Sequence, residues 1–464
     1  MNLREQALRG GAYMVIRQGI GMGLALVAML LLTRLIGPTA YGLYTTVYGV
    51  AFFFAQIARM GTDVYLVRRE DGPNDAAYHQ VFSFLLVSGT VLTIAGMLLA
   101  PAVGHWLNTS RVLWPLWAMF LLLPFSVLSV PSIARLERAL DYRNVAILET
   151  VEILVNYAIA LVLAWYHWGV WAPIAGYGAS RIWLIAGSIA MSRSVPRWHW
   201  SPALLGDILR FGSVASLSSW LWTIRLLIYI FVVGRFMGQQ SVAYIALAIR
   251  MADGLNFVKN VTFRLSLAVM AKVQRDFARL RAAMEEAMAL QVLASGPLVA
   301  GFALVAPWIL PRIFGDQWMP ALLVFPFIAL GDLVNAIFNM QVSVLFVAKR
   351  GGHVTLCNAV HITVLAAAAL WLVPRLGLIG WGLAEVIVLP TYLMLHQQVR
   401  RLFDFSYLGV LPWLIVFGAP LFTTVVGWPD AVILWLPLLL IPFNWTARRQ
   451  VTEYLGQIIR RSHA

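Results

Sequence analysis

The sequence contains few charged residues and almost no cysteine. Only 12% of its 464 residues are Asp, Glu, Lys or Arg, whereas a soluble domain carries about 25%. Cys357 is the single cysteine, which excludes an intramolecular disulfide framework. Polar stretches long enough to form a soluble domain are also absent. These absences leave the classes of protein whose solvent is lipid.

Apolar segments fill most of the chain. Hydrophobic residues make up 61% of it, and the mean hydropathy is +0.79. Because a spanning helix needs about 20 mostly apolar residues, we expect an all-α polytopic membrane protein with about 14 transmembrane helices. The expected spans are 13–36, 41–64, 79–103, 113–134, 145–166, 169–192, 213–234, 241–268, 286–310, 318–347, 353–373, 377–397, 408–427 and 430–446.

The net charge of +14 is distributed unevenly. Most Lys and Arg residues occupy alternate loops and both termini, and the other loops hold only Arg34, Arg111, Arg235, Arg312 and Arg375. Cytoplasmic loops of membrane proteins carry such an excess of cations. The bias therefore predicts that both termini are cytoplasmic, and it accounts for the basic balance without nucleic acid.

A short motif occurs twice, at corresponding places in the expected topology. The segment "RLIGPTAYGLY" at 34–44 is echoed by "RFMGQQSVAY" at 235–244. Each copy has an Arg, two apolar residues, a Gly and a polar turn before the next helix. One copy alone could be an interfacial Arg followed by a helix-ending Gly. Two copies at the same topological position predict a parallel repeat of six-helix halves, an arrangement found in transporters.

Several phrases together resemble a known family. They are "LLTRLIGPTAYGLYTTV", "IARMGTDVYLVRR", "ARLERALDYRNVAILETVEI", "GVWAPIAGYGASR", "LRFGSVASLSSW", "VVGRFMGQQSVAYIALAIRMA" and "FGDQWMPALLVF". Their order is similar to that in the polysaccharide transport family of oligosaccharide flippases, which belongs to the multidrug/oligosaccharidyl-lipid/polysaccharide exporter superfamily. The resemblance covers the chain up to about residue 400.

The resemblance implies an architecture and a cargo. It implies an N-lobe at 1–195 and a C-lobe at 196–400, related by a pseudo-twofold axis, with an added helix pair and tail at 401–464. The implied cargo is an undecaprenyl-pyrophosphate-linked oligosaccharide that crosses a bacterial inner membrane by alternating access, for capsule, exopolysaccharide or O-antigen. Some relatives couple this to H⁺ or Na⁺. A polysaccharide polymerase and a chain-length regulator are implied partners, and we expect a monomer.

Cations inside the apolar spans are candidates for binding the pyrophosphate. Arg225 lies near the centre of its span, Arg17 lies about one turn into the first span, and Arg250 lies in the eighth. An arginine at bilayer depth costs at least about 2.5 kcal/mol, so a chain that keeps one uses it or hides it. The alternatives are a buried ion pair for Arg225 and snorkelling to the cytoplasmic headgroups for Arg17.

A polar stripe follows the eighth expected span. Arg250, Asp253, Asn256, Asn260 and Arg264 are spaced three or four residues apart, so they share one helix face. We predict that Asn256 and Asn260 contact sugars in a central cavity. Alternatively, Arg250 and Asp253 neutralise each other as a structural i, i+3 pair.

Intramembrane amides and carboxylates continue this pattern on other spans. Asn335 and Asn339 share a face with Asp332 on the tenth span and are further candidate sugar contacts. Asp253, Asp332, Glu385 and Glu152 are candidates for ion coupling, since carboxylates at this depth can hold protons or sodium. Interhelical hydrogen bonding is the alternative role for each carboxylate.

Three functional classes fit a chain of this kind. The first is the flippase, and the second is a drug exporter of the same superfamily, whose cavity would be acidic. The third is a polysaccharide polymerase or ligase, which would need a substantial outer loop, whereas the outer loops here are short. We therefore predict a transporter and not an enzyme, with no catalytic residues. The eight His residues lack metal-ligand spacing, so no metal or other cofactor is expected.

Overall fold

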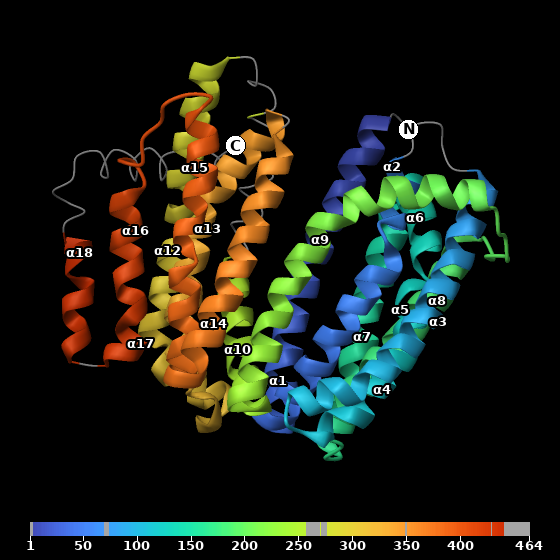
Figure 1. Cartoon of the computed structure of the whole chain (residues 1–464), viewed down its shortest axis with the longest axis horizontal. Coiled ribbons are helices and arrows are strands. Elements are labelled where there is room, and N and C mark those ends of the chain that lie inside the picture. The colour runs from blue at the N-terminus through green and yellow to red at the C-terminus, as the bar shows by residue number, and fades with distance from the viewer. Residues whose placement is uncertain are drawn as a thin grey trace. The chain divides into compact units, whose positions relative to one another are not determined.

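The chain forms helices throughout its described part, residues 3–68, 74–256, 270, 276–348, 350–427 and 429–439 of a computed structural model (Figure 1). No strand occurs among these residues, which confirms the expected all-α class. The helices group into two compact units, Met1–Ala243 and Tyr244–Ala464. Each unit is considered by itself below.

The first unit contains the longest uninterrupted run of helices at the N-terminal end of the chain. Its core is formed by apolar side chains of α1, α3, α4, α5, α6 and α8. Its elements are α1 (Leu3–Arg59), α2 (Thr62–Arg68), α3 (Asp75–Trp106), η1 (Ser110–Val112), α4 (Leu113–Leu121), α5 (Leu123–Val127), α6 (Val130–Arg138), α7 (Tyr142–Trp165), α8 (Trp171–Ser192), α9 (Pro202–Met237) and the first turn of α10 (Gln239–Leu255).

The second unit combines long helices with several short ones. The long helices α12, α13 and α14 pack in sequence order. The elements that follow α10 are α12 (Phe277–Phe314), η2 (Asp316–Trp318), α13 (Ala321–Val347), α14 (Gly351–Ile387), η3 (Leu389–Tyr392), α15 (Leu393–Arg400), α16 (Leu411–Gly418), η4 (Ala419–Phe422), α17 (Thr423–Val426), η5 (Asp430–Trp435) and α18 (Leu436–Leu439).

Many helices are long enough to cross a membrane. Six in the described part meet the requirements of length and apolarity, and the bent pair Ser110–Leu121 and Leu123–Arg138 makes a seventh. Two of the six contain more than one straight segment, because α1 is broken at Gly37 and α14 at Gly377. The chain is therefore a multi-pass membrane protein, and the count of 14 spans stays a prediction.

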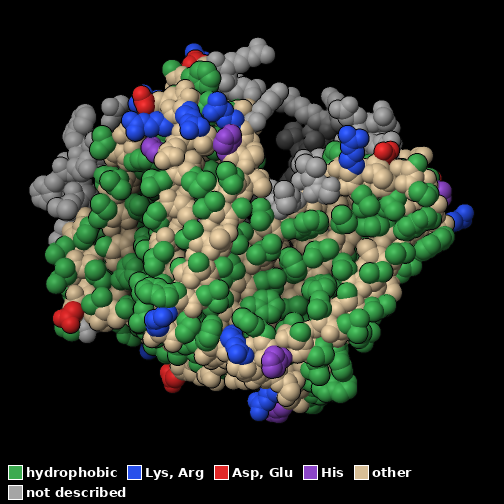
Figure 2. Space-filling view, viewed as in Figure 1, with side chains coloured by type: hydrophobic (Ala, Val, Ile, Leu, Met, Phe, Trp, Pro, Cys, Tyr) green, Lys and Arg blue, Asp and Glu red, His purple; other side chains and the backbone are tan. Residues whose placement is uncertain are grey.

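The visible surface matches this conclusion. Figure 2 shows hydrophobic side chains over most of the face in view, with Lys, Arg, Asp and Glu toward the ends of the helices. Large apolar side chains such as Leu98, Trp165 and Leu408 are exposed. Exposed apolar patches of this extent indicate contact with lipid or a partner, and the helix lengths indicate lipid.

The repeated R-x-x-G motif forms the same turn at each copy. Gly37 (φ 75°, ψ 169°) and Gly238 (φ 81°, ψ 178°) both adopt a backbone conformation that is essentially restricted to glycine. Each of these glycines ends one helix and lets the next begin directly. The structure adds a third copy that the repeat search missed, "RIFG" at 312–315, in which Gly315 has φ 96° and ψ 158°.

Helix α9 packs along the second half of α1 within the first unit. Gly42 lies so close to the start of α10 that a β-carbon there would come within 1.7 Å of the Gln239 carbonyl oxygen. Thr46 Oγ1 donates to Gln239 Oε1 at 2.5 Å. At the other end of the contact, Trp220 Nε1 donates to the Gln56 carbonyl at 3.1 Å. The helix that opens the second predicted repeat therefore belongs to the first packed unit.

The boundary between the packed units differs from the predicted lobe boundary. The units meet between residues 243 and 244, whereas the lobes were predicted from the repeat to meet at 195–196. A repeat boundary describes internal symmetry, and a packing boundary describes which helices contact one another. The predicted lobes at 1–195, 196–400 and 401–464 therefore stay a prediction.

Candidate functional site

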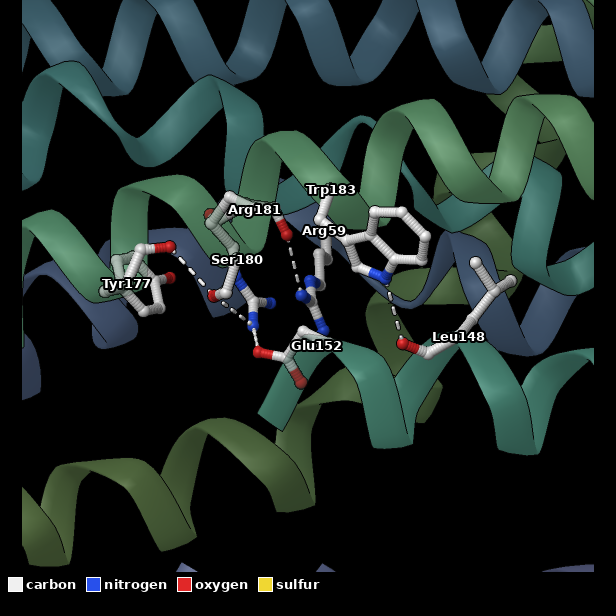
Figure 3. Close-up of polar contacts among 8 residues, drawn as sticks. Arg59, Leu148, Glu152, Tyr177, Ser180, Arg181 and Trp183 are labelled. Atoms are coloured by element: carbon white, nitrogen blue, oxygen red, sulfur yellow. Dashed lines mark hydrogen bonds and ion pairs between the residues drawn. The ribbon is translucent and has the colours of Figure 1, made fainter. Parts of the chain in front are cut away.

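An ion pair joins α7 and α8 inside the first unit (Figure 3). Arg181 Nη2 donates to Glu152 Oε1, and the two side chains are 14% and 18% exposed. The Arg181 guanidinium also lies 4.9 Å from the centroid of the Tyr177 ring, one turn back along α8. Glu152 was predicted as a coupling carboxylate, and the structure gives it a cationic partner that the sequence analysis did not name.

Arg59, the last residue of α1, brings a second cation to this cluster. Its Nη2 donates to the carbonyl oxygen of Ser126 at 2.9 Å, and its Nε is buried without a hydrogen-bond partner. Among the described residues no carboxylate forms an ion pair with Arg59, and the nearby Asp63 is exposed. The arginines 59 and 181 are close enough to repel each other. We define this cluster by Arg59, Glu152, Tyr177 and Arg181 and call it the arginine cluster.

The carbonyl that Arg59 binds belongs to a broken helix. The segments before and after residue 122 are bent by 49°, and α5 ends at Val127 before α6 begins at Val130. The last carbonyl groups of a helix have no intrahelical donor. Arg59 supplies a donor for one of these groups, at Ser126. The arginine cluster therefore lies at a discontinuity of the fourth expected span, the type of position at which transporters build ligand sites.

A row of aromatic rings leads along α1 to the arginine cluster. Successive centroids of Tyr41, Tyr44, Tyr48 and Phe52 are 6.5, 5.7 and 5.8 Å apart. Tyr48 also meets the Tyr177 ring edge-on at 5.6 Å. Tyrosines offer an apolar face and a polar hydroxyl, a combination that suits saccharide rings. The sequence analysis did not single out these residues.

In the second unit, the structure brings together two residues predicted separately. Asn256 Nδ2, at the end of α10, donates to Asp332 Oδ2 on α13 at 3.2 Å. Asn256 is 2% exposed, and its Oδ1 is buried without a hydrogen-bond partner. This contact places an amide oxygen and a carboxylate at one interhelical position, where they could share a small cation.

The other predicted amides of α13 lie beside the end of α14. Asn335 Nδ2 donates to the Tyr392 hydroxyl at 2.8 Å, and Phe338 stacks on the Tyr392 ring at 4.9 Å. Asn339 is half-buried, and its carbonyl oxygen accepts from Ser343 Oγ at 3.0 Å. Asn335 is thus engaged by a tyrosine of the short helix η3 in this state.

The remaining predicted residues are dispersed. Arg225 is half-buried on α9, Arg250 and Asp253 are exposed on α10, and Glu385 is 4% exposed on α14. Each of these four makes contacts in the structure. Asn260 and the side chain of Arg17 lie outside the described residues. The site roles predicted for all of them stay predictions.

The sequence held a signal for the arginine cluster that was read only as resemblance. Arg59 and Arg181 end the phrases "IAR" and "GASR", which were quoted for the family likeness. Both arginines also fall within the expected spans 41–64 and 169–192, as does Glu152 in 145–166. Searching for opposite charges on neighbouring spans would have paired Arg181 with Glu152.

Within the described residues, no group of three His, Cys, Asp or Glu side chains is placed to hold a metal ion. The polar clusters consist of guanidinium, carboxylate, amide and phenol groups inside apolar helices. Such groups bind charged or hydroxylated cargo and do not resemble a nucleophile with its base. The geometry is that of a membrane transport protein.

Comparison with known proteins agrees with this class. A solved structure of the lipid II flippase MurJ in an inward closed conformation has a TM-score of 0.73 at 14% identity, covering 96% of this chain and 99% of MurJ. An inward-facing MATE family multidrug transporter of the MOP superfamily has a TM-score of 0.63 at 16% identity, covering 84% and 98%. The chain thus has the fold of these transporters.

The family follows from the sequence matches. Residues 31–323 match the model of the polysaccharide biosynthesis protein family, and the chain belongs to that family. The chain is 23% identical over 357 residues to the lipopolysaccharide biosynthesis protein WzxC of Escherichia coli (strain K12), covering 75% of this chain and 72% of WzxC. It is 23% identical over 309 residues to the succinoglycan biosynthesis transport protein ExoT of Rhizobium meliloti (strain 1021), covering 66% and 62%. The expected resemblance is confirmed, and the protein is a transporter and not an enzyme.

Proposed function

We propose that the protein is a flippase for an undecaprenyl-pyrophosphate-linked oligosaccharide, a precursor of capsule, exopolysaccharide or O-antigen. It moves this lipid across a bacterial inner membrane by alternating access, with both termini in the cytoplasm. Membership of the polysaccharide biosynthesis family and the likeness to WzxC and ExoT support a glycan cargo. The fold shared with the flippase MurJ supports a lipid-linked one.

The observation that carries an anionic cargo is the state of Arg59. Its guanidinium is placed among apolar helices, bonds only one carbonyl oxygen and lacks an ion pair among the described residues. A cation in low dielectric needs an anionic partner, and arginine binds phosphate oxygens through two parallel hydrogen bonds. A pyrophosphate would supply the missing charge. Arg17, Arg225 and Arg250 are proposed to guide it along the rest of the path.

The glycan is proposed to contact the tyrosine row and the amides. Tyr44 and Tyr48 extend from the arginine cluster along α1, so a sugar next to a pyrophosphate at Arg59 would face their rings. Asn256, Asn260, Asn335 and Asn339 are the proposed contacts in the second unit. The cycle is reset by an ion, H⁺ or Na⁺, at Asp332 and Asn256, with Asp253, Glu385 and Glu152 as further candidates.

The experiment uses cells that lack this protein and carry wild type or a variant. We would measure the undecaprenyl-pyrophosphate-linked oligosaccharide in each membrane leaflet. Wild type should relieve an inner-leaflet accumulation. Arg59→Gln, which keeps donors but not the charge, should lose at least about tenfold in transport, the loss expected for a charged hydrogen bond of about 1.4 kcal/mol or more. Arg59→Lys should retain part of the activity.

Arg279→Ala is the matched control, because that side chain is 78% exposed. Equal transport by Arg59→Gln and wild type would remove Arg59 from the cargo path. Unchanged lipid in both leaflets combined with altered drug tolerance would favour the second candidate, a drug exporter, which the likeness to MATE transporters supports. Outer-leaflet lipid that stays unpolymerised would point to a missing polymerase activity instead.

A further inference from the structure

A buried histidine lies at the interruption of the helix that follows it. His361 is on α14, well inside the expected span 353–373, and is 7% exposed. The other end of its contact is Thr391 of η3, where α14 has ended at Ile387 and α15 has not yet begun. Pro390 lacks an N–H and so cannot continue the helical hydrogen bonds. His361 therefore contacts backbone that is not regular helix at membrane depth.

The hydrogen bonds of Thr391 fix the tautomer of this histidine. Thr391 Oγ1 donates its only hydrogen to the Val388 carbonyl oxygen at 2.7 Å. The 2.9 Å contact between His361 Nδ1 and Thr391 Oγ1 therefore requires Nδ1 to be the donor. Nδ1 carries a hydrogen in either charge state, so a proton that changes the charge of His361 binds at Nε2.

The histidine is linked to the intramembrane carboxylate of α13. Its ring lies 5.1 Å from the ring of Tyr392, whose hydroxyl accepts from Asn335 at 2.8 Å. Asn335 is one turn along α13 from Asp332, which accepts from Asn256. Residues from α10, α13, η3 and α14 thus form one chain of contacts, which we call the histidine network: Asn256, Asp332, Asn335, His361, Thr391 and Tyr392.

Charge on His361 would act directly on the helix interruption. The titratable or charged groups on the elements packed against α14 are Asp332 on α13, Tyr392 on η3, and His396 and Arg400 on α15; α14 itself carries His353, Cys357, Arg375 and Glu385. Burial disfavours an imidazolium, whereas the Asp332 carboxylate and the Tyr392 ring face favour one. Gain or loss of a proton therefore changes how strongly η3 is held to α13.

We propose that His361 is the proton-binding residue that couples this transporter to a proton gradient. The inference rests on the proposed flippase function and names its coupling ion as H⁺. Nε2 binds a proton from one side of the membrane, the charged histidine network stabilises one arrangement of η3 against α13, and release to the other side permits the return. A proton shifts the balance between two states only because one of them binds it more tightly.

The test uses the full chain in proteoliposomes, with lipid-linked oligosaccharide purified from cells that lack the protein. Two rates are measured, exchange without a gradient and translocation under a gradient of about one pH unit, which is a tenfold difference in proton concentration. His361→Gln keeps a donor for Thr391 but cannot titrate. His353→Gln, an exposed histidine on the same helix, is the matched control.

We expect wild type and His353→Gln to be accelerated by the gradient, by up to about tenfold. His361→Gln should exchange lipid within about twofold of wild type, with no acceleration by the gradient and a flat pH profile. Acceleration of His361→Gln equal to that of wild type would overturn the proposal. Loss of exchange as well as acceleration in His361→Gln would also overturn it, because the role would then be structural.

The proposed function and this inference fail differently. Wild type that exchanges the lipid but responds to a sodium gradient and not to a pH gradient overturns His361 as the coupling residue and leaves the flippase intact. Wild type that moves no lipid-linked oligosaccharide under any gradient overturns the flippase function, and the inference falls with it.

Discussion

Arg181 on α8 and Glu152 on α7 form an ion pair inside the first unit, under the ring of Tyr177. Because both side chains are mostly buried, removing one partner leaves the other charge without compensation, at a cost of about 3 to 5 kcal/mol. Arg59 adds a second positive charge nearby, so losing Glu152 would be worse than losing a neutral hydrogen bond.

We predict that Glu152→Gln lowers thermal stability more than Arg181→Met does. Glu152→Gln leaves two neighbouring cations, whereas Arg181→Met leaves Glu152 with Arg59 as a nearby cation. The midpoint of thermal aggregation, followed by size-exclusion fluorescence in detergent, measures the difference. The double variant should be more stable than Glu152→Gln alone, and independent losses in the double variant would contradict the pairing.

Gly42→Ala should destabilise the protein. Its new β-carbon would meet backbone of α10 at the Gln239 carbonyl, which cannot rotate away. Overpacking of this kind costs typically about 1 to 3 kcal/mol. Gly301→Ala is the control, since no atom lies within 4 Å of a β-carbon there. A normal aggregation midpoint for Gly42→Ala would mean that α1 and α10 separate freely.

Gly238→Ala tests the turn conformation without a steric clash. No heavy atom lies within 4 Å of the added β-carbon, but φ is 81°. Holding a non-glycine residue in such backbone costs about 1 to 3 kcal/mol. The aggregation midpoint should therefore fall, whereas Gly352→Ala, also in open space but at a helical position, should leave it unchanged.

Tyr407→Phe should destabilise the second unit. The Tyr407 hydroxyl accepts from Gln341 Nε2 at 2.7 Å, and Gln341 Oε1 is buried without a partner. Removing the hydroxyl would leave Gln341 wholly unsatisfied, at about 1 to 3 kcal/mol. Burial raises the pKa of Tyr407, so the hydroxyl stays neutral and the loss should be the same at pH 6 and pH 9. Tyr166→Phe, at an exposed position, is the control.

The sequence predicted the class, the family and several of the residues that meet. Long apolar stretches determine helices in lipid, because only a helix or a closed barrel satisfies its own backbone there. Asn256 and Asp332 were both selected as polar residues on predicted helix faces, and the structure joins them. Helical periodicity gives the face of each residue, so such choices succeed within one helix.

Contacts between distant helices could not be predicted in the same way. The bond from Arg59 to Ser126 depends on the bend between α4 and α5, and the role of Thr391 depends on the interruption before α15. A single sequence gives neither bend angles nor the partner of a buried cation. The third R-x-x-G turn was missed for another reason: its glycine leads into the short helix η2, where a span was not expected to begin.

The packing of α9 on α1 means that chain order and mechanical grouping do not coincide. The extended segment 194–201 is the natural place to divide the sequence into its two repeats, yet a fragment ending there would lack α9 and expose the face that Gly42, Thr46 and Gln56 present to it. Each repeat is therefore incomplete as a folding unit. Gene fission or domain exchange at that linker should yield insoluble halves, whereas the ancestral duplication had to produce both copies in one polypeptide before this arrangement could be stable.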